Sequence, residues 1–582
     1  MEKTAVQLAA YDMTDMIQPG QSETRTLHVD LQDIASYDMA HENADGTQGT
    51  WILDAGKYYF TVANGTHDAL NNILAKQGKT VSNTNGLMDA DGNAAAVYEY
   101  AYDGINGNVD DNTFAVSKNN AMVSNHLEYG DWNYYEPGRV TQLSRGDWSG
   151  TWPVEYKDMT APASMLNDLN GKYYTVSTTD DTSDIVFGAD NGMKFYEMAF
   201  RDFNDPDWKK LIDQMTIEEC LGLLCYGGNE FRAIPSIGFV RGSFTENSGN
   251  GMQSEMCDSR VDAPWAVDKK DNNGHFYLEL YATAPTVAAS FNPSLQFRMG
   301  EEVGLQGLIV GLPILWGPGL NTHRMAYNGR SGDYYSEDPI LTGNTGMEFA
   351  IGAFKYGLLA SPKHFAFNDQ ETNRGGVAPF MTEQRAREVE LRAFQIPIEA
   401  NKYDAQAPEY WTGEEDHDFG MRGLMTSFSK IGGVECTASE GLVSDIAKSE
   451  WGFVGYAVTD IGDDTDLFAA VANSGVTGYD LRGRFSESGF AAHTYEGENI
   501  SAEMFAKDAN ILTKLKEAAH NTIWAFCQTN LMNAYDASTS YQSVMTWWKM
   551  AYMAAIATTG VLFVGMCAAY VVCYQKSRKE NG

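Results

Sequence analysis

The chain has 582 residues, of which 43% are hydrophobic and 12% aromatic, so it can bury a large core and form more than one domain. Its formal net charge is −37, from 78 acidic and 41 basic side chains. No basic patch stands out along the sequence, which excludes nucleic acid as a partner. An acidic surface suits a body that stays dispersed near anionic cell envelopes.

The first part of the chain is predicted to be a small all-β module over residues 1–77. Short strands are predicted at 23–29 and 57–62, between turn signals at Pro19-Gly20 and Ala55-Gly56. Residues 78–205 are rich in Asn, Asp, Gly, Ser and Thr and are predicted to be an irregular connector. Aromatic residues within Leu143–Pro153 could dock against a neighbouring domain.

From Trp208 onward the pattern alternates between helix and strand, which indicates an α/β fold. Helices are predicted at 217–224 and 383–400. The second helix carries Glu383/Arg387 and Glu388/Arg392 at i,i+4 spacing, typical of pairs on a helix surface. Four apolar runs read as buried parallel strands: 307–315, 357–360, 423–425 and 455–458. We therefore predict a (β/α)8 barrel over residues 206–535.

Polar side chains follow each of these runs, and in such barrels the chemistry collects where the strands end. Lys363 and His364 follow the second run, and Arg374 comes soon after. These cations would repel one another unless an anion or a dense array of hydroxyls lies among them, and Glu371 can hold Arg374 in place. Sugar hydroxyls fit this set best, while a solvated salt-bridge cluster is the plainer alternative.

Asp460 ends the fourth run. A carboxylate at this position can attack an anomeric carbon or stabilise positive charge that develops there. Asp463, Asp464 and Asp466 follow it, and we interpret them as helix capping or solvated residues, since their spacing does not match an EF-hand calcium loop.

The cysteines are predicted to be scattered buried thiols, because their number is odd and their spacing fits no zinc template. The seven are Cys220, Cys225, Cys257, Cys436, Cys527, Cys567 and Cys573. We expect no metal and no organic cofactor.

The C-terminal region predicts a transmembrane helix over residues 548–574. Residues 550–574 carry no formal charge, and aromatic residues flank one end, as in an interfacial belt. Lys576, Arg578 and Lys579 follow the other end, which predicts a cytoplasmic tail and an extracellular body. A buried core helix is the alternative. No secretory signal opens the chain, which suggests a longer natural protein.

Several ordered motifs resemble glycoside hydrolase family 3, in its β-glucosidase-like branch. They are Asn321–Arg324, Gly329-Arg330 with Tyr334–Pro339, Lys363–Arg374 and Glu450–Asp460. The stretch from Pro19 to Gly65 is similar to the family's fibronectin type III-like domain. This order resembles permuted members, in which an α/β sandwich domain would come earlier still.

The resemblance implies that Asp460 is the nucleophile of a retaining mechanism. It implies a sugar-binding role for further residues: Lys363, His364, Arg374, Arg330, Arg324, Asn247, Met425 and Phe428. Some positions depart from the family pattern. Asn247 stands where the family has an aspartate, Gln253 where it has an arginine, Phe428 where it has a tyrosine, and Ile461 where it has an aromatic residue. We expect weakened or altered sugar binding from these changes.

The second carboxylate of a retaining site is not apparent in the sequence. The resemblance implies that this acid comes from the α/β sandwich domain, and neither Glu371 nor Glu435 stands out as a replacement. We expect hydrolysis of β-linked glucosides or oligosaccharides by a membrane-anchored enzyme. The alternatives are a weakly active or inactive carbohydrate-binding scaffold, or an N-terminally truncated fragment of the enzyme.

Overall fold

The computed structural model describes most of the chain, in two compact units, Met1–Ala537 and Ser538–Gly582. Structure is described for residues 2–109, 112–155, 158–171, 173–225, 230–231, 233–239, 242–246, 252, 271, 275–400, 421–460, 467–476, 490–495, 498–500, 502–539 and 545–582.

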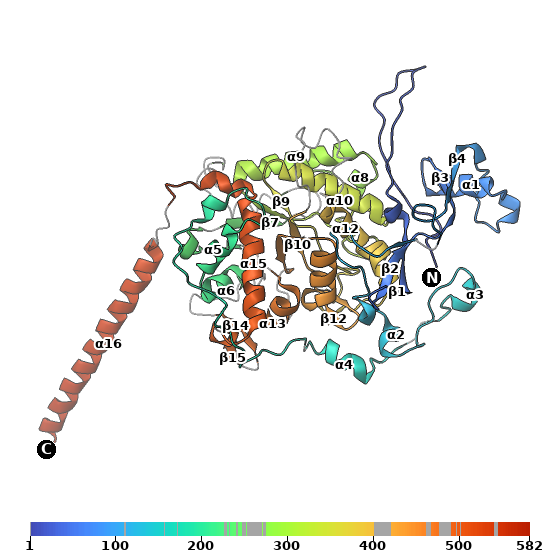
Figure 1. Ribbon diagram of the computed structural model, residues 1–582. Helices are drawn as coiled ribbons and strands as arrows, with labels where there is room; N and C mark the ends of the chain where they lie inside the picture. The colour runs from blue at the N-terminus through green and yellow to red at the C-terminus, as the bar shows by residue number, and fades with distance from the viewer. Residues whose placement is uncertain are drawn as a thin grey trace. The chain divides into compact units, whose positions relative to one another are not determined.

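The first unit contains a barrel-like arrangement of short strands (Figure 1). They are β6 (Glu230–Phe231), β7 (Gly242–Glu246), β8 (Ile314–Trp316), β9 (Leu359–Ala360), β10 (Gly423–Met425) and β13 (Tyr456–Val458). β7, β8 and β9 are parallel neighbours, as are β10 and β13, and a parallel bridge from Phe365 to Thr426 links the two groups. β6, which is not among the four predicted strands, runs antiparallel to β7.

Helical segments separate these strands, as the sequence pattern predicts. They are α5 (Asp207–Asp213), α6 (Ile217–Cys225), α8 (Ala284–Ala288), α9 (Pro293–Val310), α10 (Pro339–Phe354), α11 (Glu383–Arg385), η9 (Ala386–Glu390), α12 (Arg392–Ile398), η12 (Gly441–Glu450), α13 (Leu467–Ala469), η13 (Ala470–Ser474), α14 (Ala502–Phe505) and α15 (Ala509–Cys527). Side chains at the N-caps explain two starts, since Asn292 accepts from Leu295 N–H before α9 and Asp338 accepts from Ile340 N–H before α10. The predicted helices at 217–224 and 383–400 are confirmed.

One predicted strand is partly helical. The apolar run 307–315 begins inside α9, which continues to Val310, and β8 starts at Ile314. Gly311 ends the helix with φ of 76°, the left-handed conformation that glycine adopts without strain. A short apolar run has no period that distinguishes a buried helix end from a buried strand, which explains the error.

The N-terminal region pairs strands across the predicted boundary at residue 77. β1 (Ser36–Glu42) and β2 (Gln48–Ile52) form a sheet with β5 (Thr113–Phe114), and β3 (Gly56–Thr61) pairs with β4 (Val97–Tyr102). β3 confirms the strand predicted at 57–62, but residues 23–29 form no strand, and helix α1 (Thr66–Lys76) lies inside the predicted all-β module. The fibronectin type III-like assignment stays a prediction.

The remaining elements of this unit are short. They are η1 (Leu31–Ile34), η2 (Val81–Asn83), η3 (Ala94–Ala96), η4 (Glu128–Gly130), α2 (Trp132–Tyr135), α3 (Trp148–Thr151), α4 (Ala163–Leu169), η5 (Phe195–Met198), η6 (Pro235–Ile237), η8 (Arg374–Gly376), β11 (Lys430–Ile431), β12 (Val434–Glu435), η11 (Cys436–Ala438), β14 (Phe490–Tyr495), β15 (Glu498–Ile500) and η14 (Asn530–Ala534).

A buried ion cluster joins the N-terminal region to the barrel helices. Arg387 contacts Glu383 at 2.8 Å and Glu450 at 2.7 Å, and its guanidinium lies 4.6 Å from the centre of the Tyr37 ring. The side chain of Arg387 is 2% exposed, so the predicted surface pair is in fact buried. The second predicted pair does not form, because Arg392 binds Asp33 at 2.6 Å instead of Glu388.

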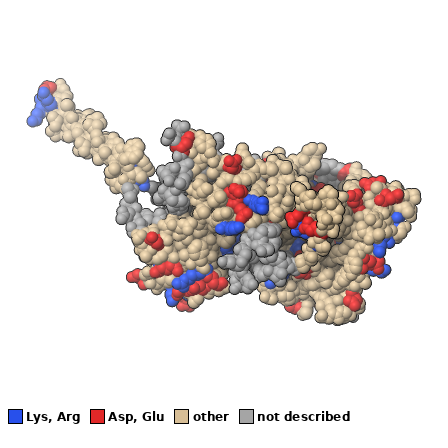
Figure 2. Space-filling view, turned by 90° about the horizontal axis from the view of Figure 1, so that it is seen from above, with Lys and Arg blue, Asp and Glu red and all other residues tan. Residues whose placement is uncertain are grey.

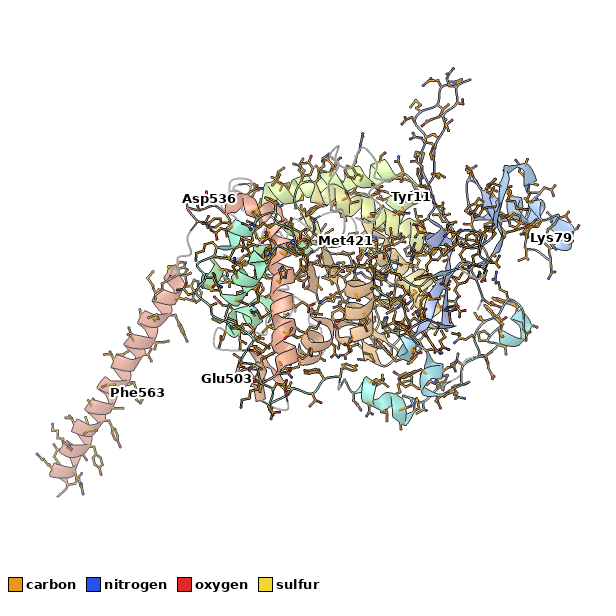
Figure 3. The ribbon with its side chains drawn as sticks, viewed as in Figure 1. Tyr11, Lys79, Met421, Glu503, Asp536 and Phe563 are labelled. Atoms are coloured by element: carbon orange, nitrogen blue, oxygen red, sulfur yellow. The ribbon has the colours of Figure 1, made fainter. Side chains whose placement is uncertain are left out.

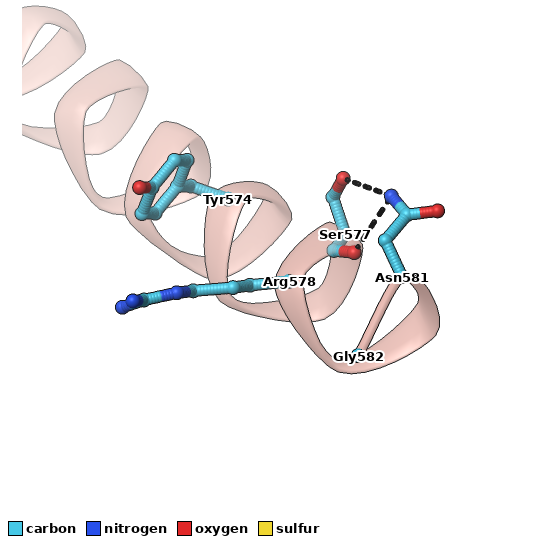
Figure 4. Close-up of a pocket in the computed structure, with 5 residues that line it drawn as sticks. All are labelled: Tyr574, Ser577, Arg578, Asn581 and Gly582. Atoms are coloured by element: carbon cyan, nitrogen blue, oxygen red, sulfur yellow. Dashed lines mark hydrogen bonds between the residues drawn. The ribbon is translucent and has the colours of Figure 1, made fainter.

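The second unit consists mainly of one helix, α16 (Trp547–Glu580), with no buried residue. Figure 2 shows it without charge along most of its length and with Lys and Arg at its free end, and Phe563 projects outward in Figure 3. It is long and apolar enough to cross a membrane, and the alternative of a buried core helix is wrong. A concavity near its end (Figure 4) is lined by Tyr574 and Arg578, among others, and there the Asn581 amide donates to the Ser577 carbonyl.

The described cysteines form no disulfide with one another. Cys220, Cys436 and Cys527 are buried, as predicted, whereas Cys567 and Cys573 are exposed on α16. The side chains of Cys225 and Cys257 lie outside the described residues.

Candidate active site

Four strand ends bring the predicted polar residues to one place. Backbone hydrogen bonds continue beyond the strands, because Lys363 N–H donates to the Pro318 carbonyl at 2.9 Å and Phe365 N–H donates to the Met425 carbonyl at 2.7 Å. Thr426 N–H likewise donates to the Val458 carbonyl at 2.8 Å. This ladder fixes the segments after β8, β9, β10 and β13 side by side at the same edge of the sheet.

Asp460 lies directly after β13, and its residue is 4% exposed. Its Oδ2 atom is 3.4 Å from His364 Nε2 and 4.0 Å from Arg374 Nη1. The structure therefore brings together the carboxylate and two of the three basic side chains that the sequence singled out, His364 and Arg374. The third, Lys363, is 1% exposed and precedes His364 in the chain.

Arg374 is held in place from two sides. Glu371 Oε2 is 3.1 Å from its Nη1 atom, as the sequence predicts, and its guanidinium lies 4.5 Å from the centre of the Phe428 ring. A guanidinium over an aromatic face is attracted by the ring's negative quadrupole. Phe428 thus contributes a contact to the site that depends on its ring and not on a hydroxyl.

Hydrogen bonds fix His364 at both its backbone and its ring. Its N–H donates to Asn321 Oδ1 at 2.7 Å, and Asn321 Nδ2 donates back to its carbonyl at 2.9 Å. Its ring Nδ1 lies 3.1 Å from the Tyr334 hydroxyl. Burial lowers the pKa of His364 well below its usual range, and the nearby cations lower that pKa further, which favours the neutral imidazole.

Two further arginines lie at the edge of this group and bind carboxylates. Arg330 Nε contacts Asp333 Oδ2 at 2.6 Å, and its Nη1 is 3.8 Å from Glu371 Oε1. Arg324 forms an ion pair with Asp369, whose pKa burial raises to about 6. Both arginines are thus connected to the site through carboxylates. Glu371 lies between Arg330 and Arg374 and connects these two side chains.

Of the remaining predicted site residues, the structure describes Met425. Met425 is 1% exposed and packs in a core cluster with Trp316 and Val458. Asn247, Gln253 and Ile461 lie outside the described residues, as do Asp463, Asp464 and Asp466. Across the described parts of the chain, no three His, Cys, Asp or Glu side chains gather as a metal site requires.

Sequence reasoning missed the roles of Tyr334 and Asn368. Both belong to the motifs that carry the resemblance, but nothing in their spacing predicts that they meet behind His364. Asn368 Nδ2 donates to the Tyr334 hydroxyl at 2.7 Å, and both residues are almost completely buried. Two other residues of the motif Tyr334–Pro339 have a purely structural role, because Asp338 caps helix α10 and Pro339 is its first residue.

The fold and this site define an α/β barrel protein with a carboxylate, a neutral imidazole and a guanidinium at its strand ends. Residues 244–470 match the model of the glycosyl hydrolase family 3 N terminal domain. The chain is 25% identical over 524 residues to a β-glucosidase of Ruminococcus albus, covering 88% of this chain and 46% of that protein. Residues 244–470 therefore resemble the N-terminal domain of glycoside hydrolase family 3, and the proteins similar to this chain include β-glucosidases.

Two further likenesses support the fold and widen the range of relatives. An exo-α-(1→6)-L-arabinopyranosidase of Bifidobacterium longum is 27% identical over 271 residues, covering 46% of this chain and 32% of that protein. A β-glucosidase structure from Paenibacillus barengoltzii has a TM-score of 0.57 at 18% identity and covers 93% of this chain and 51% of that chain. This chain thus spans about half, or less, of the length of these relatives.

Proposed function

We propose that this chain carries the nucleophile of a retaining glycosidase that hydrolyses β-linked glucosides or oligosaccharides. The observation that supports it is the placement of Asp460, 3.4 Å from His364 Nε2 and 4.0 Å from Arg374 at the strand ends. An Asp460 oxygen attacks C1 of the sugar as the leaving group departs, and water then hydrolyses the glycosyl-enzyme ester. The names of the relatives include a β-glucosidase and an arabinopyranosidase, so the specificity is proposed at the level of a pyranose.

The neighbours of Asp460 have matching roles in this proposal. Lys363 and His364 hold hydroxyls of the sugar, and Arg374, aligned by Glu371 and Phe428, orients the carboxylate and binds the ring from the other side. Arg330 and Arg324 support this group through Glu371 and Asp369. Neutral hydroxyls suit a site in which carboxylates already balance most of the cations.

We propose that the acid that protonates the leaving group comes from an α/β sandwich domain of the kind that the family resemblance implies. Glu371 is engaged by Arg374, Arg330 and Asn368, and Glu435 binds Lys430 at 2.6 Å, so each has a structural partner. Substrates with good leaving groups need little help from an acid. We therefore expect turnover of activated aryl β-glucosides to exceed that of alkyl glucosides by far.

The deciding experiment is labelling with a 2-deoxy-2-fluoro-β-glucoside that carries an activated leaving group. Intact mass should increase by one fluoroglucosyl group, and peptide mapping should place it on Asp460. Asp460→Asn should abolish both labelling and turnover, lowering kcat by about 10⁴-fold or more, as for removal of a catalytic nucleophile. Glu435→Gln is the matched control, because it removes a β12 carboxylate outside the proposed machinery and should keep labelling.

Labelling at another residue, or no labelling with the activated substrate, contradicts the proposal. Calorimetric binding of glucosides without any turnover would favour the carbohydrate-binding scaffold instead. The replacement of the expected tyrosine by Phe428 is the observation that favours that alternative, because it removes a hydroxyl from the site.

A further inference from the structure

A chain of buried hydrogen bonds lies behind His364, on the side of the ring away from Asp460. Asn368 Nδ2 is 2.7 Å from the Tyr334 hydroxyl, and that hydroxyl is 3.1 Å from His364 Nδ1. Each of the three residues is at most 1% exposed. Because water does not reach these groups, the direction of each hydrogen bond follows from the donors and acceptors present.

The orientation of Asn368 sets the direction of the chain. Its Nδ2 atom also lies 3.1 Å from Glu371 Oε1, and a carboxylate that binds two arginines accepts hydrogen bonds. The amide nitrogen, not the oxygen, therefore faces both Glu371 and Tyr334. Asn368 donates to the Tyr334 oxygen, and burial raises the pKa of Tyr334, so this residue keeps its proton.

The proton of Tyr334 has one acceptor in the described part of the chain. The hydrogen-bond partners of its hydroxyl there are Asn368, which donates, and His364 Nδ1. Tyr334 therefore donates to Nδ1. A neutral imidazole has one acceptor and one donor nitrogen, so the hydrogen of His364 must lie on Nε2, which faces Asp460 at 3.4 Å.

We propose that Tyr334, oriented by Asn368, is a positioning residue that holds His364 as the Nε2–H tautomer and directs this N–H toward Asp460 and the sugar bound beside it. Its effect on turnover rests on the proposed function, whereas its effect on the tautomer does not. In the opposite tautomer, an Nε2 lone pair would face the carboxylate and repel it. Tyr334 therefore prevents the tautomer in which His364 Nε2 would accept a hydrogen bond instead of donating one.

The direct test is nuclear magnetic resonance of the full chain in detergent, with ¹⁵N-labelled histidine. His364→Gln identifies the His364 signals by their loss. At pH 7 we expect Nδ1 to show the shift of an unprotonated nitrogen and Nε2 that of a protonated one. Tyr334→Phe should convert this into a mixture of tautomers, while Tyr335→Phe, which removes the hydroxyl of the buried neighbouring tyrosine, should leave the spectrum unchanged.

The kinetic test uses an activated aryl β-glucoside. Tyr334→Phe should lower kcat/KM about 5- to 20-fold, the loss expected when one buried hydrogen bond disappears, and Tyr335→Phe less than twofold. Tyr334→Phe combined with Asn368→Ala should lose less than the product of the two single losses, because both act through His364. A purely structural role would lower the melting temperature without changing the tautomer.

An Nδ1–H tautomer or an imidazolium in the wild type overturns the inference, as does an unchanged His364 spectrum in Tyr334→Phe. A wild type that labels at Asp460 but shows equal kinetics for Tyr334→Phe and Tyr335→Phe also overturns it. A wild type without any glycosidase activity defeats the proposed function instead, and the spectra still decide the tautomer.

Discussion

The pKa values of two histidines, the buried His364 and the half-buried His126, are shifted by their neighbours in opposite directions. His364 has cations around it, and together with burial they lower its pKa well below the usual range. His126 lies 3.3 Å from each of two carboxylates, Asp445 and Glu450. Burial alone lowers the pKa of His126, but the two carboxylates outweigh it and raise that pKa to about 9. One ring is therefore a neutral donor, and the other is a cation that links the N-terminal region to η12.

The charge on His126 predicts a pH-dependent stability. A group with a higher pKa in the folded state stabilises the fold fully below its unfolded pKa and loses this contribution as pH rises through the folded pKa. The contribution of His126 should thus fall between pH 6.5 and about 9, by about 3 kcal/mol at most. The measurement is the difference in free energy of urea unfolding between wild type and His126→Gln, which should shrink over this range.

A difference measurement is needed because Lys448, whose pKa burial lowers to about 8, titrates in the same range with the opposite effect. His67→Gln provides the control for replacing a histidine at an exposed position, since its side chain is 85% exposed. A His126→Gln curve parallel to that of the wild type would refute the expectation.

Helices α9 and α10 pack unusually closely because glycines line their contact. A Cβ on Gly300 would lie 2.1 Å from the Phe349 carbonyl oxygen, and one on Gly352 would lie 2.2 Å from that of Phe297. The neighbouring atoms belong to the backbone, which cannot move aside as the end of a flexible side chain can. The two helices can therefore pack at this distance only with glycine at these positions. The close contact sets the position of β8, which follows α9, and of the site segment that leads into α10.

Gly300→Ala should therefore destabilise the barrel by about 1–3 kcal/mol, as overpacking does, despite the better helix propensity of alanine. Gly222 in α6 is the matched control, because a Cβ there would meet nothing within 4 Å. Gly222→Ala should be neutral or stabilise by up to about 1 kcal/mol. Urea unfolding measures both, and equal effects of the two substitutions would show that the helix contact is not limiting.

At the scale of the whole molecule, the acidic body and the apolar helix α16 form separate units. With 34 residues, α16 is about 51 Å long at 1.5 Å per residue, which exceeds a hydrocarbon core of about 30 Å. Its two tryptophans, Trp547 and Trp548, lie at its N-terminal end. Three of its cations lie at its C-terminal end, namely Lys576, Arg578 and Lys579. We propose a membrane anchor with the body outside the cell and the tail inside.

Flotation with phospholipid vesicles tests this anchor. The full chain should float with the vesicles, and a chain ending at Ala537 should stay at the bottom of the gradient. Phe563→Lys should weaken association, because a lysine near the centre of a spanning helix costs about 2.5–3.5 kcal/mol. Flotation of the shortened chain, or none by the full chain, would contradict an anchoring role for α16.

The sequence alone determined the strand ends and the residues placed on them. Buried parallel strands appear as apolar runs, and their ends meet at one edge of the sheet, so the pattern of the chain by itself predicts that Lys363, His364, Arg374 and Asp460 come together. The apolar helix at the C-terminus is equally predictable, because its length and lack of charge are local properties.

Only the tertiary structure decided how these residues are held. The Tyr334 hydrogen bond to His364, the Phe428 ring under Arg374 and the burial of Arg387 against Glu450 each join segments that are far apart in the sequence. No local pattern reports such contacts, because they depend on which surfaces meet when the barrel closes. The run 307–315 shows the same limit, since a short apolar stretch becomes helix or strand according to its neighbours.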